Sequence, residues 1–533
     1  MARIEYRNLD RVESFTRLLE VERPNLSALL CADRLAESEI PIGAGLVYNY
    51  AAKPVDQPIL AQLQGIADEQ QLIAKYREIL DGGIMNAGEG RMVLHHLCRG
   101  KLGADVAPEG RSVREFYEEQ RGRFGDFARA VHGGSITAAG GSAFTSIVQI
   151  GIGGSDLGPR ALFLALLGHE YEYAGKRRRG PLLETRFISN VDPDDAAIAL
   201  RGLDPQTTLF IVVSKSGTTQ ETLTNEALAI RWLSGGGVAS PKKQIVVVTS
   251  ETSPMARSAD YLDSFFIDDF IGGRYSSTSA VGGTVLSLAY GPEVFEELLA
   301  GAHEADRLAL DPVAANNAAL MDALIGVYER NVLGLPATAV LPYSQALIRF
   351  PAHLQQLDME SNGKQVNRDG EPVAYDTGPI IFGEPGTNGQ HSFYQLLHQG
   401  TSVIPLQFIG FRQNQSDADL DFDGSSSQTK LTANLTAQIV AFALGKRDDN
   451  ANKNFPGGRP SSLIHGDRLT PASLGALLAH YENKVMFQGL IWNINSFDQE
   501  GVQLGKVLTK KVLAGGGSDP VLAGYARLLG VTL

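Results

Sequence analysis

The chain has 533 residues, of which 43% are hydrophobic and 20% are charged, and its formal net charge is −13. A chain of this length is expected to form two or more domains rather than one core. Its acidic balance excludes nucleic-acid binding as a main function. The first residues are charged without an apolar core, and no apolar run reaches membrane-spanning length. We therefore expect a cytoplasmic soluble protein with no membrane segment.

Two features speak against a metal site. The two cysteines, Cys31 and Cys98, do not form a zinc motif or a disulfide framework and suggest buried thiols in a reducing compartment. His95 and His96 are adjacent, so their side chains point apart, and no further ligand stands at a useful spacing. The sequence predicts no bound metal.

Up to about residue 135 the pattern is mostly helical, and near residue 145 it changes. Ser146–Ile150 is a short β-rich run, and GIGGSDLGPR and an apolar helix follow. The glycines, Gly154 among them, allow close approach of a ligand to the backbone, and Ser155 can cap the helix, whose N–H groups suit a phosphate. A dinucleotide is disfavoured, because Asp156 stands where a Rossmann fingerprint has its third glycine. A plain strand–helix turn is an equal alternative for this motif alone.

A second unit of the same kind follows, with the strand Leu209–Val213 and the loop SKSGTTQET. Thr218 and Glu221 have the spacing of a capping box, which places a helix start here. Small hydroxyls, a lysine and free N–H groups at a helix start suit a phosphate monoester. A third strand at Ile245–Val248 completes three strand–turn–helix units, which predict a parallel, doubly wound sheet with its ligand at the carboxyl ends. The candidate phosphate residues of the loop are Ser214, Lys215, Ser216 and Thr219.

Two basic features need separate interpretations. The run KRRR at 176–179 is predicted to be a solvated loop. Arg274 follows two glycines in FIGGRYSSTSAVGG, so it can reach a ligand held against the backbone, although a surface loop arginine is the safer interpretation by itself.

The run Pro351–Lys364, which contains QQLDMESNGK, predicts a helix and its stop. Gln356 lies four residues before Glu360, so the amide and the carboxylate share one helical face beside the buried Leu357. A glutamate at the edge of a buried face is poorly solvated and suits a general base. A surface glutamate at a helix end is the alternative.

Two later residues are weaker candidates. His391 in GTNGQHSFYQ stands where a helix should begin, which favours a neutral imidazole. Lys506 lies in DQEGVQLGKVLTKK on a predicted helix. A histidine that merely opens a helix and a solvated lysine are the alternatives.

Taken together, the motifs resemble the glucose-6-phosphate isomerase (phosphoglucose isomerase) family. The resemblance runs in order through GIGGSDLGP, SKSGTTQET, GGRYSSTSAVG, QQLDMESNGK, GTNGQHSFYQ and GVQLGK, from about Gly151 to Lys506. It implies an α/β fold of two doubly wound sugar-isomerase (SIS) domains with mainly parallel sheets, plus helical N-terminal and C-terminal segments. The expected boundaries are 1–135 for an N-terminal segment that packs on the second domain, 136–290 and 291–500 for the two domains, and 501–533 for the tail.

The resemblance also implies roles for the candidates, in the conversion of glucose 6-phosphate to fructose 6-phosphate by a homodimer without cofactor. Glu360 would move the proton between C2 and C1, and Arg274 would stabilise the enediolate. His391, supplied by the partner subunit, and Lys506 would open the sugar ring. Gln356 would bind substrate beside the base. The phosphate would be held by Gly154, Ser155, Ser214, Lys215, Ser216 and Thr219.

Two departures from the family pattern affect fine substrate placement only: Gly217 stands where some members carry an aromatic residue, and Gln503 where an acidic residue is common. A sugar-phosphate sensor without turnover would leave Glu360, His391 and Lys506 idle. A glutamine-dependent amidotransferase would need an N-terminal cysteine, and the chain begins Met1-Ala2. The dual phosphoglucose/phosphomannose isomerases are much shorter, so mannose 6-phosphate is at most a side substrate.

Overall fold

The computed structural model describes residues 4–416, 418–515 and 519–531. It divides into two compact units, Met1–Ser496 and Phe497–Leu533. None of the described helices is both long enough and apolar enough to cross a lipid bilayer.

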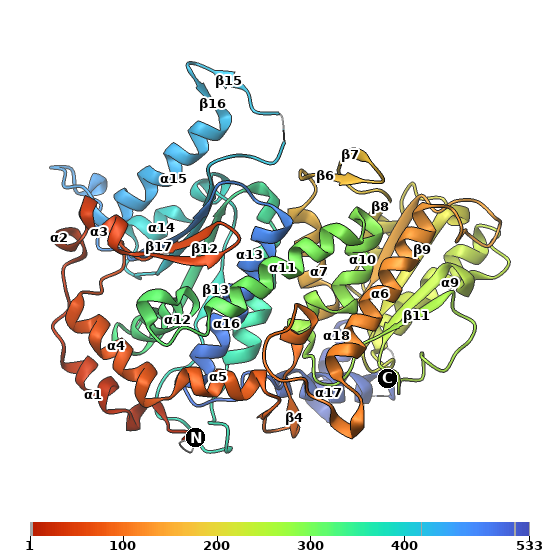
Figure 1. The fold of residues 1–533 in the computed structure, drawn as a ribbon, viewed down its shortest axis with the longest axis horizontal. Coiled ribbons are helices and arrows are strands. Elements are labelled where there is room, and N and C mark those ends of the chain that lie inside the picture. Colours follow the sequence, from red (N-terminus) through yellow and green to blue (C-terminus); the bar gives the residue numbers. More distant parts are fainter. Residues whose placement is uncertain (1–3, 417, 516–518, 532–533) are drawn as a thin grey trace. The chain divides into compact units, whose positions relative to one another are not determined.

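The first sheet of the larger unit is entirely parallel (Figure 1). Its strands in spatial order are β11 (Asp263–Phe266), β10 (Ile245–Thr249), β9 (Thr208–Val213), β5 (Ser146–Ile150) and β8 (Glu184–Ile188). Every residue of β5, β9 and β10 is buried, as expected for strands covered on both faces. The carboxyl ends of all five strands therefore lie at one edge of the sheet, where their loops meet.

Helices cover both faces of this sheet. Alternate strand residues such as Val148, Phe210 and Val247 pack with apolar residues of α8 (Pro193–Leu200) and α9 (Gln220–Gly235). In addition, β5 and β9 contact α10 (Ala280–Tyr290). The edge strand β11 contacts α6 (Val113–His132), and α6 packs along α10. This arrangement confirms the predicted doubly wound architecture.

The second sheet is mixed, with a parallel centre and an antiparallel edge. Its order is β1 (Glu39–Gly43), β2 (Leu46–Asn49), β17 (Ser461–Gly466), β14 (Leu406–Phe411), β12 (Ala337–Tyr343) and β13 (Ile380–Phe382). One face packs against α14 (Tyr394–Gln399) and α15 (Ser427–Leu444). Beyond the sheet, α11 (Pro292–Leu308) and α12 (Ala318–Val327) pack along the buried α16 (Pro471–Ile491).

The N-terminal segment is mostly helical, as predicted, and also supplies strands. Its hairpin β1–β2 pairs antiparallel with β17, so residues 39–49 extend the second sheet (Figure 1). A second hairpin is formed by β3 (Ile84–Asn86) and β4 (Arg91–Met92). The other helices of the segment are α1 (Glu13–Glu20), α2 (Leu26–Leu29), α3 (Ala32–Glu37), α4 (Gln57–Glu69) and α5 (Leu72–Leu80).

Two loop predictions are wrong. The KRRR run is an exposed strand, β7 (Lys176–Arg179), which pairs with β6 (Glu170–Tyr173). The polar sequence of residues 411–430 likewise predicts a surface loop, but this stretch contains the short strands β15 (Asp421–Phe422) and β16 (Ser425–Ser426) and the start of α15. In both places local backbone pairing forms short hairpins in polar sequence. The smaller unit contains α17 (Gln503–Leu513) and α18 (Pro520–Leu528), in agreement with a helical tail. The domain boundaries stay predictions.

Candidate active site

The glycine turn after β5 packs tightly against the segment that carries Arg274. A Cβ atom added to Gly154 would lie 2.1 Å from the carbonyl oxygen of Gly273 and 2.7 Å from the backbone nitrogen of Arg274. Gly153 has a φ of +60°, and its added Cβ would lie 3.2 Å from Nε2 of Gln356. The absence of side chains at these two positions therefore lets the turn contact both the Arg274 segment and the segment that carries Gln356.

Ser155 does not cap the helix after the turn, so that prediction is wrong. A 3₁₀ turn, η4 (Gly153–Ser155), precedes α7 (Leu157–Ala165) and moves the N-cap to Asp156, which makes no side-chain capping bond. The Asp156 carboxylate instead lies 2.6 Å from Nη2 of Arg160, and burial still raises its pKa. Ser155 remains at the turn, and its carbonyl oxygen accepts a hydrogen bond of 2.8 Å from Gln149.

The hydroxyl loop follows β9, the neighbour of β5 in the sheet. Ser214 Oγ donates to Thr219 Oγ1 at 3.1 Å, which brings two candidate phosphate residues together. Ser216 Oγ accepts from the backbone nitrogen of Thr218 at 3.2 Å. The helix α9 begins here as predicted, but its N-cap is Thr219 without a side-chain capping bond, so the predicted capping box is wrong. The hydroxyls are therefore not committed to capping the helix.

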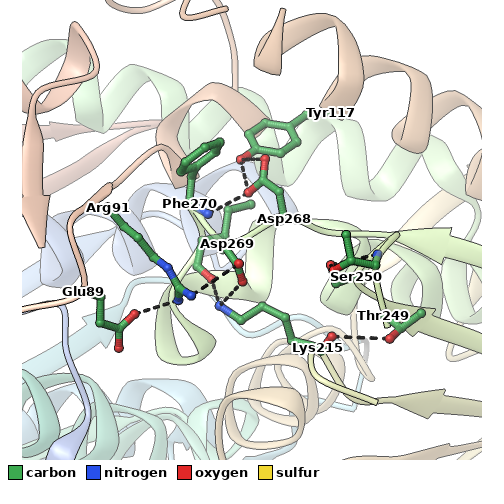
Figure 2. A network of polar contacts seen from close by, with 11 residues as sticks. Glu89, Arg91, Tyr117, Lys215, Thr249, Ser250, Asp268, Asp269 and Phe270 are labelled. Carbon is green, nitrogen blue, oxygen red and sulfur yellow. Dashed lines mark hydrogen bonds and ion pairs between the residues drawn. The ribbon is translucent and has the colours of Figure 1, made fainter. Parts of the chain in front are cut away.

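The ammonium group of Lys215 joins this loop to the segment before Arg274 (Figure 2). Lys215 Nζ donates to the carbonyl oxygen of Ile271 at 3.0 Å and lies 3.9 Å from Oδ1 of Asp269. Burial lowers the pKa of Lys215, and Asp269 opposes this shift. On its other oxygen, Asp269 faces Nη2 of Arg91 at 3.4 Å. These contacts couple the hydroxyl loop to the segment before Arg274.

Asp268 fixes the same segment from its buried side. Both of its carboxylate oxygens lie 2.8 Å from the hydroxyl group of Tyr117, and Oδ1 also accepts from the backbone nitrogen of Phe270 at 2.9 Å (Figure 2). Burial raises the pKa of Asp268 to about 6, and the hydrogen bond from Tyr117 opposes this rise. The backbone that leads to Arg274 is thus held on two sides.

Glu360 and Gln356 share a face, as their spacing predicts. Gln356 Nε2 donates to Glu360 Oε2 at 3.0 Å. The predicted single helix is in fact α13 (Phe350–Leu354) followed by a π-helical segment, η11 (Gln355–Glu360). Short π-helical segments inside helices are frequent at functional sites, where they change the direction of side chains. The Glu360 side chain is 21% exposed, so it is partly shielded and still accessible.

Arg274 is almost completely buried and connects three parts of the site. Its Nη1 lies 3.5 Å from Oε2 of Glu360, and its side chain is 1% exposed. Its Nε donates to Ser361 Oγ at 2.7 Å, and its Nη2 donates to the carbonyl oxygen of Ser496 at 2.6 Å. These bonds hold a permanent positive charge beside the Glu360 carboxylate.

With this geometry established, comparisons with known proteins identify the family. A family model described as phosphoglucose isomerase matches residues 49–525. The chain belongs to the phosphoglucose isomerase family. It is 57% identical over 535 residues to glucose-6-phosphate isomerase of Treponema denticola, covering 99% of this chain and 100% of the relative. It is 46% identical over 528 residues to that of Borreliella burgdorferi, covering 98% and 99%.

A solved structure supports the same assignment. The crystal structure of a glucose-6-phosphate isomerase from Chlamydia trachomatis matches the fold with a TM-score of 0.91 and 42% identity, covering 98% of this chain and 100% of that one. The resemblance of the sequence motifs to the phosphoglucose isomerase family is therefore confirmed, and so is the α/β fold with mainly parallel sheets.

The structure does not bring His391 to Glu360 within the larger unit, and Lys506 belongs to the smaller unit. His391 is exposed at the end of a 3₁₀ turn, η12 (Asn388–His391), three residues before α14 begins. It therefore does not open that helix, because the extra turn intervenes. It makes no hydrogen bond or ion pair with any described residue. Lys506 is exposed on α17 of the smaller unit.

Sequence reasoning missed the residues that orient Arg274. Ser361 is fully buried, accepts from Arg274 and lies 3.0 Å from the hydroxyl oxygen of Tyr275. Ser496 closes the other side through its carbonyl oxygen. Ser361 and Tyr275 directly follow Glu360 and Arg274 in the family motifs, and this adjacency was the available signal. Nothing in the local sequence marks Ser496.

Proposed function

We propose that this protein catalyses the reversible isomerisation of D-glucose 6-phosphate to D-fructose 6-phosphate, by ring opening and proton transfer through a cis-enediol, in glycolysis and gluconeogenesis. The observation that carries this proposal is the Glu360 carboxylate, held between the amide of Gln356 and the guanidinium of Arg274. Nearly full-length relatives named glucose-6-phosphate isomerase support the choice of substrate.

The proposed base is Glu360. An aldose–ketose conversion needs one group that removes a proton from one carbon and returns it to the neighbour, so one carboxylate suffices. Gln356 restrains one carboxylate oxygen of Glu360 at 3.0 Å, which limits the rotation of the side chain. The base is thus positioned before the substrate binds, which reduces the entropy lost on the way to the transition state.

Arg274 is the proposed electrostatic partner. Negative charge develops on the oxygens at C1 and C2 as the enediol forms, and a fixed cation in a water-poor site stabilises such charge strongly. The guanidinium is buried, and Ser361 and Ser496 already fix its orientation. It therefore needs little reorganisation as the charge develops.

The proposed phosphate site is the edge of the first sheet where the two loops meet. Gly154 and Ser155 come from one loop, and the hydroxyl-bearing side chains of residues 214–219 come from the next. Lys215 adds positive charge at this edge, although its ammonium group is bound to Ile271 in the present arrangement. A phosphate held here would orient the sugar without taking part in the chemistry. The proposed phosphate residues are Gly154, Ser155, Ser214, Lys215, Ser216 and Thr219.

His391 and Lys506 are proposed to open the sugar ring. The exposed position of His391 agrees with its use at the active site of a partner subunit, so we propose a homodimer with shared sites. A cytoplasmic location is proposed with the same glycolytic role.

A direct assay tests the proposed activity. Purified protein with fructose 6-phosphate and EDTA is expected to form glucose 6-phosphate, detected by a coupled glucose-6-phosphate dehydrogenase reaction. Activity should persist after dialysis against the chelator, because the proposed acid–base and electrostatic roles belong to side chains. Absence of product would contradict the isomerase proposal. Activity that is lost on dialysis and restored by a divalent ion would contradict a metal-free reaction.

The phosphate site predicts the behaviour of a double variant. Ser214→Ala with Thr219→Ala removes two adjacent hydroxyl donors, so KM for fructose 6-phosphate should rise about tenfold or more, from the loss of hydrogen bonds to a charged group. Thr224→Ala is the matched control, because it removes an exposed hydroxyl from α9, the helix that follows this loop. An unchanged KM in the double variant would place the phosphate elsewhere.

The shared site predicts complementation between inactive chains. His391→Ala and Glu360→Gln homodimers should each be nearly inactive. Mixed dimers should regain part of the activity, because one of their two sites then holds both an intact His391 and an intact Glu360. Subunit exchange is verified by native mass spectrometry of differently tagged chains. Verified exchange without recovery would count against a shared site.

A further inference from the structure

A small cavity lies behind η11 and is lined by Asp358, by Gln407 of β14 and by Gln488 of α16. These three side chains are 5%, 1% and 1% exposed. Asp358 is two residues before Glu360, and helical positions two apart face different sides. The cavity is therefore on the far side of the segment from the proposed base, and it has room for about one water molecule.

Three oxygen atoms at this cavity lack a hydrogen-bond partner among the described residues. They are Oδ1 of Asp358, Oε1 of Gln407 and Oε1 of Gln488. The orientation of the Gln407 amide is fixed, because its Nε2 donates to Asp322 Oδ2 at 2.7 Å. Buried polar atoms in native proteins nearly always have a protein or water partner. Three orphan acceptors at one cavity therefore point to a donor between them.

Among the described residues, none of the cations around the cavity makes an ion pair with Asp358. Each neighbouring cation already has a carboxylate partner: Lys53 with Glu329 at 2.7 Å, Lys484 with Asp322 at 3.3 Å, and Arg330 with Asp376 at 3.0 Å. His480 also contacts Asp322, at 3.1 Å. Burying an unpaired carboxylate is costly, so the neutral acid is favoured. Burial raises the pKa of Asp358 to about 7, while Lys484 lowers it and Asp322 raises it further.

In one arrangement a single water molecule satisfies all three oxygens. A water molecule has two hydrogens, which satisfy the oxygens of Gln407 and Gln488. A protonated Asp358 donates the third hydrogen to the water oxygen. An ionised Asp358 would instead need one of the water hydrogens, so the third oxygen would need a donor from elsewhere, such as the Lys484 ammonium group that also lines the cavity.

We propose that this cavity is an internal water site, in which the water accepts a hydrogen bond from the protonated carboxyl group of Asp358 and donates to Gln407 and Gln488. In the isomerase reaction, on which this part of the inference rests, Asp358 is a positioning residue. Through the water it links the π-helical segment η11 to β14 and α16, on the side of the segment opposite Glu360. Because it is protonated, it adds no negative charge on that side.

The protonated acid has a signature in stability that does not depend on activity. The folded protein keeps the proton up to about pH 7, whereas an unfolded aspartic acid loses it near pH 4. The stability from this group is complete below about pH 4 and is lost as pH rises to about 7. Asp358→Asn removes this dependence, so its melting temperature relative to the wild type should rise between these pH values and then stay constant. Asp369→Asn, which removes an aspartate outside the cavity, is the control.

Spectroscopy and crystallography test the hydrogen bonds directly. The infrared difference spectrum between the wild type and Asp358→Asn, which cancels the contribution of Asp268, should show a carboxylic-acid C=O band at about pH 6 that weakens as the pH rises past about 7. A high-resolution crystal structure should show water between Asp358, Gln407 and Gln488. A melting difference that does not change with pH, the absence of the band, or a cation bound to an ionised Asp358 would overturn the proposal.

Kinetics test the positioning role. Asp358→Leu should lower kcat about 10- to 100-fold with little change in KM, because a displaced base costs rate while the phosphate loops are untouched. Asp358→Asn should recover most of this loss, because its amide also donates to the water. If Asp358→Leu does not fold, Gln488→Met removes one acceptor at similar volume and should lower kcat in the same way. Equal losses in both Asp358 variants would overturn the positioning role and leave the isomerase proposal standing.

Discussion

Glu360→Gln is expected to lower kcat by about 10²–10⁴-fold, the usual contribution of a general base. The amide keeps the size of the side chain and can still accept the hydrogen bond from Gln356, but it cannot take up the proton. Binding of fructose 6-phosphate should survive, because the glycine turn and the hydroxyl loop are unchanged. Turnover is measured in the coupled assay, and binding by calorimetry.

The same variant separates proton transfer from ring opening. Ring opening is assigned to His391 and Lys506, so Glu360→Gln should still accelerate it, as measured by NMR of the sugar anomers. Exchange of the C2 proton with solvent deuterium should fall with kcat. Glu304→Gln is the matched control, since this partly buried glutamate accepts a hydrogen bond from the backbone of Ala44. Deuterium incorporation at the wild-type rate would show that another group is the base.

The relation between Glu360 and Gln356 could be predicted because it is local. Their spacing of four residues puts both side chains on one helical face, and the structure joins them by a hydrogen bond. The strands β5, β9 and β10 could be predicted for a similar reason, since short apolar runs between glycine and hydroxyl turns are typical of buried parallel strands. Local periodicity was sufficient in these cases.

Long-range contacts could not be predicted in this way. The orientation of Arg274 depends on Ser361 and Ser496, which lie 87 and 222 residues away along the chain. The hairpin β1–β2 joins the second sheet by pairing with β17, a strand more than 400 residues later. The π-helical segment η11 also escapes prediction, because one extra residue per turn hardly changes a pattern with a period of 3.6.

Arg274→Met is expected to lower kcat by about 10²–10³-fold, the usual effect of removing one fixed group that stabilises a developing oxyanion. Methionine fills much of the volume but leaves the Ser361 hydroxyl and the Ser496 carbonyl without their donor. The variant should therefore also unfold at a lower temperature, by an amount that corresponds to about 1–3 kcal/mol for each unsatisfied buried acceptor. Both kcat and the unfolding free energy should be measured on the same preparation.

Two further variants separate the catalytic loss from the structural one. Arg459→Met also removes a buried arginine that donates to backbone carbonyl oxygens, those of Ser402 and Gly400 at 3.2 and 2.6 Å, and so it should lower stability while keeping kcat. Arg274→Lys restores the positive charge, but its single nitrogen cannot reach Glu360, Ser361 and Ser496 together, so kcat should recover only in part. Full recovery with lysine would mean that charge alone matters at this position. An Arg274→Met variant as active as Arg459→Met would show that Arg274 supports the fold and leaves the enediolate to another group.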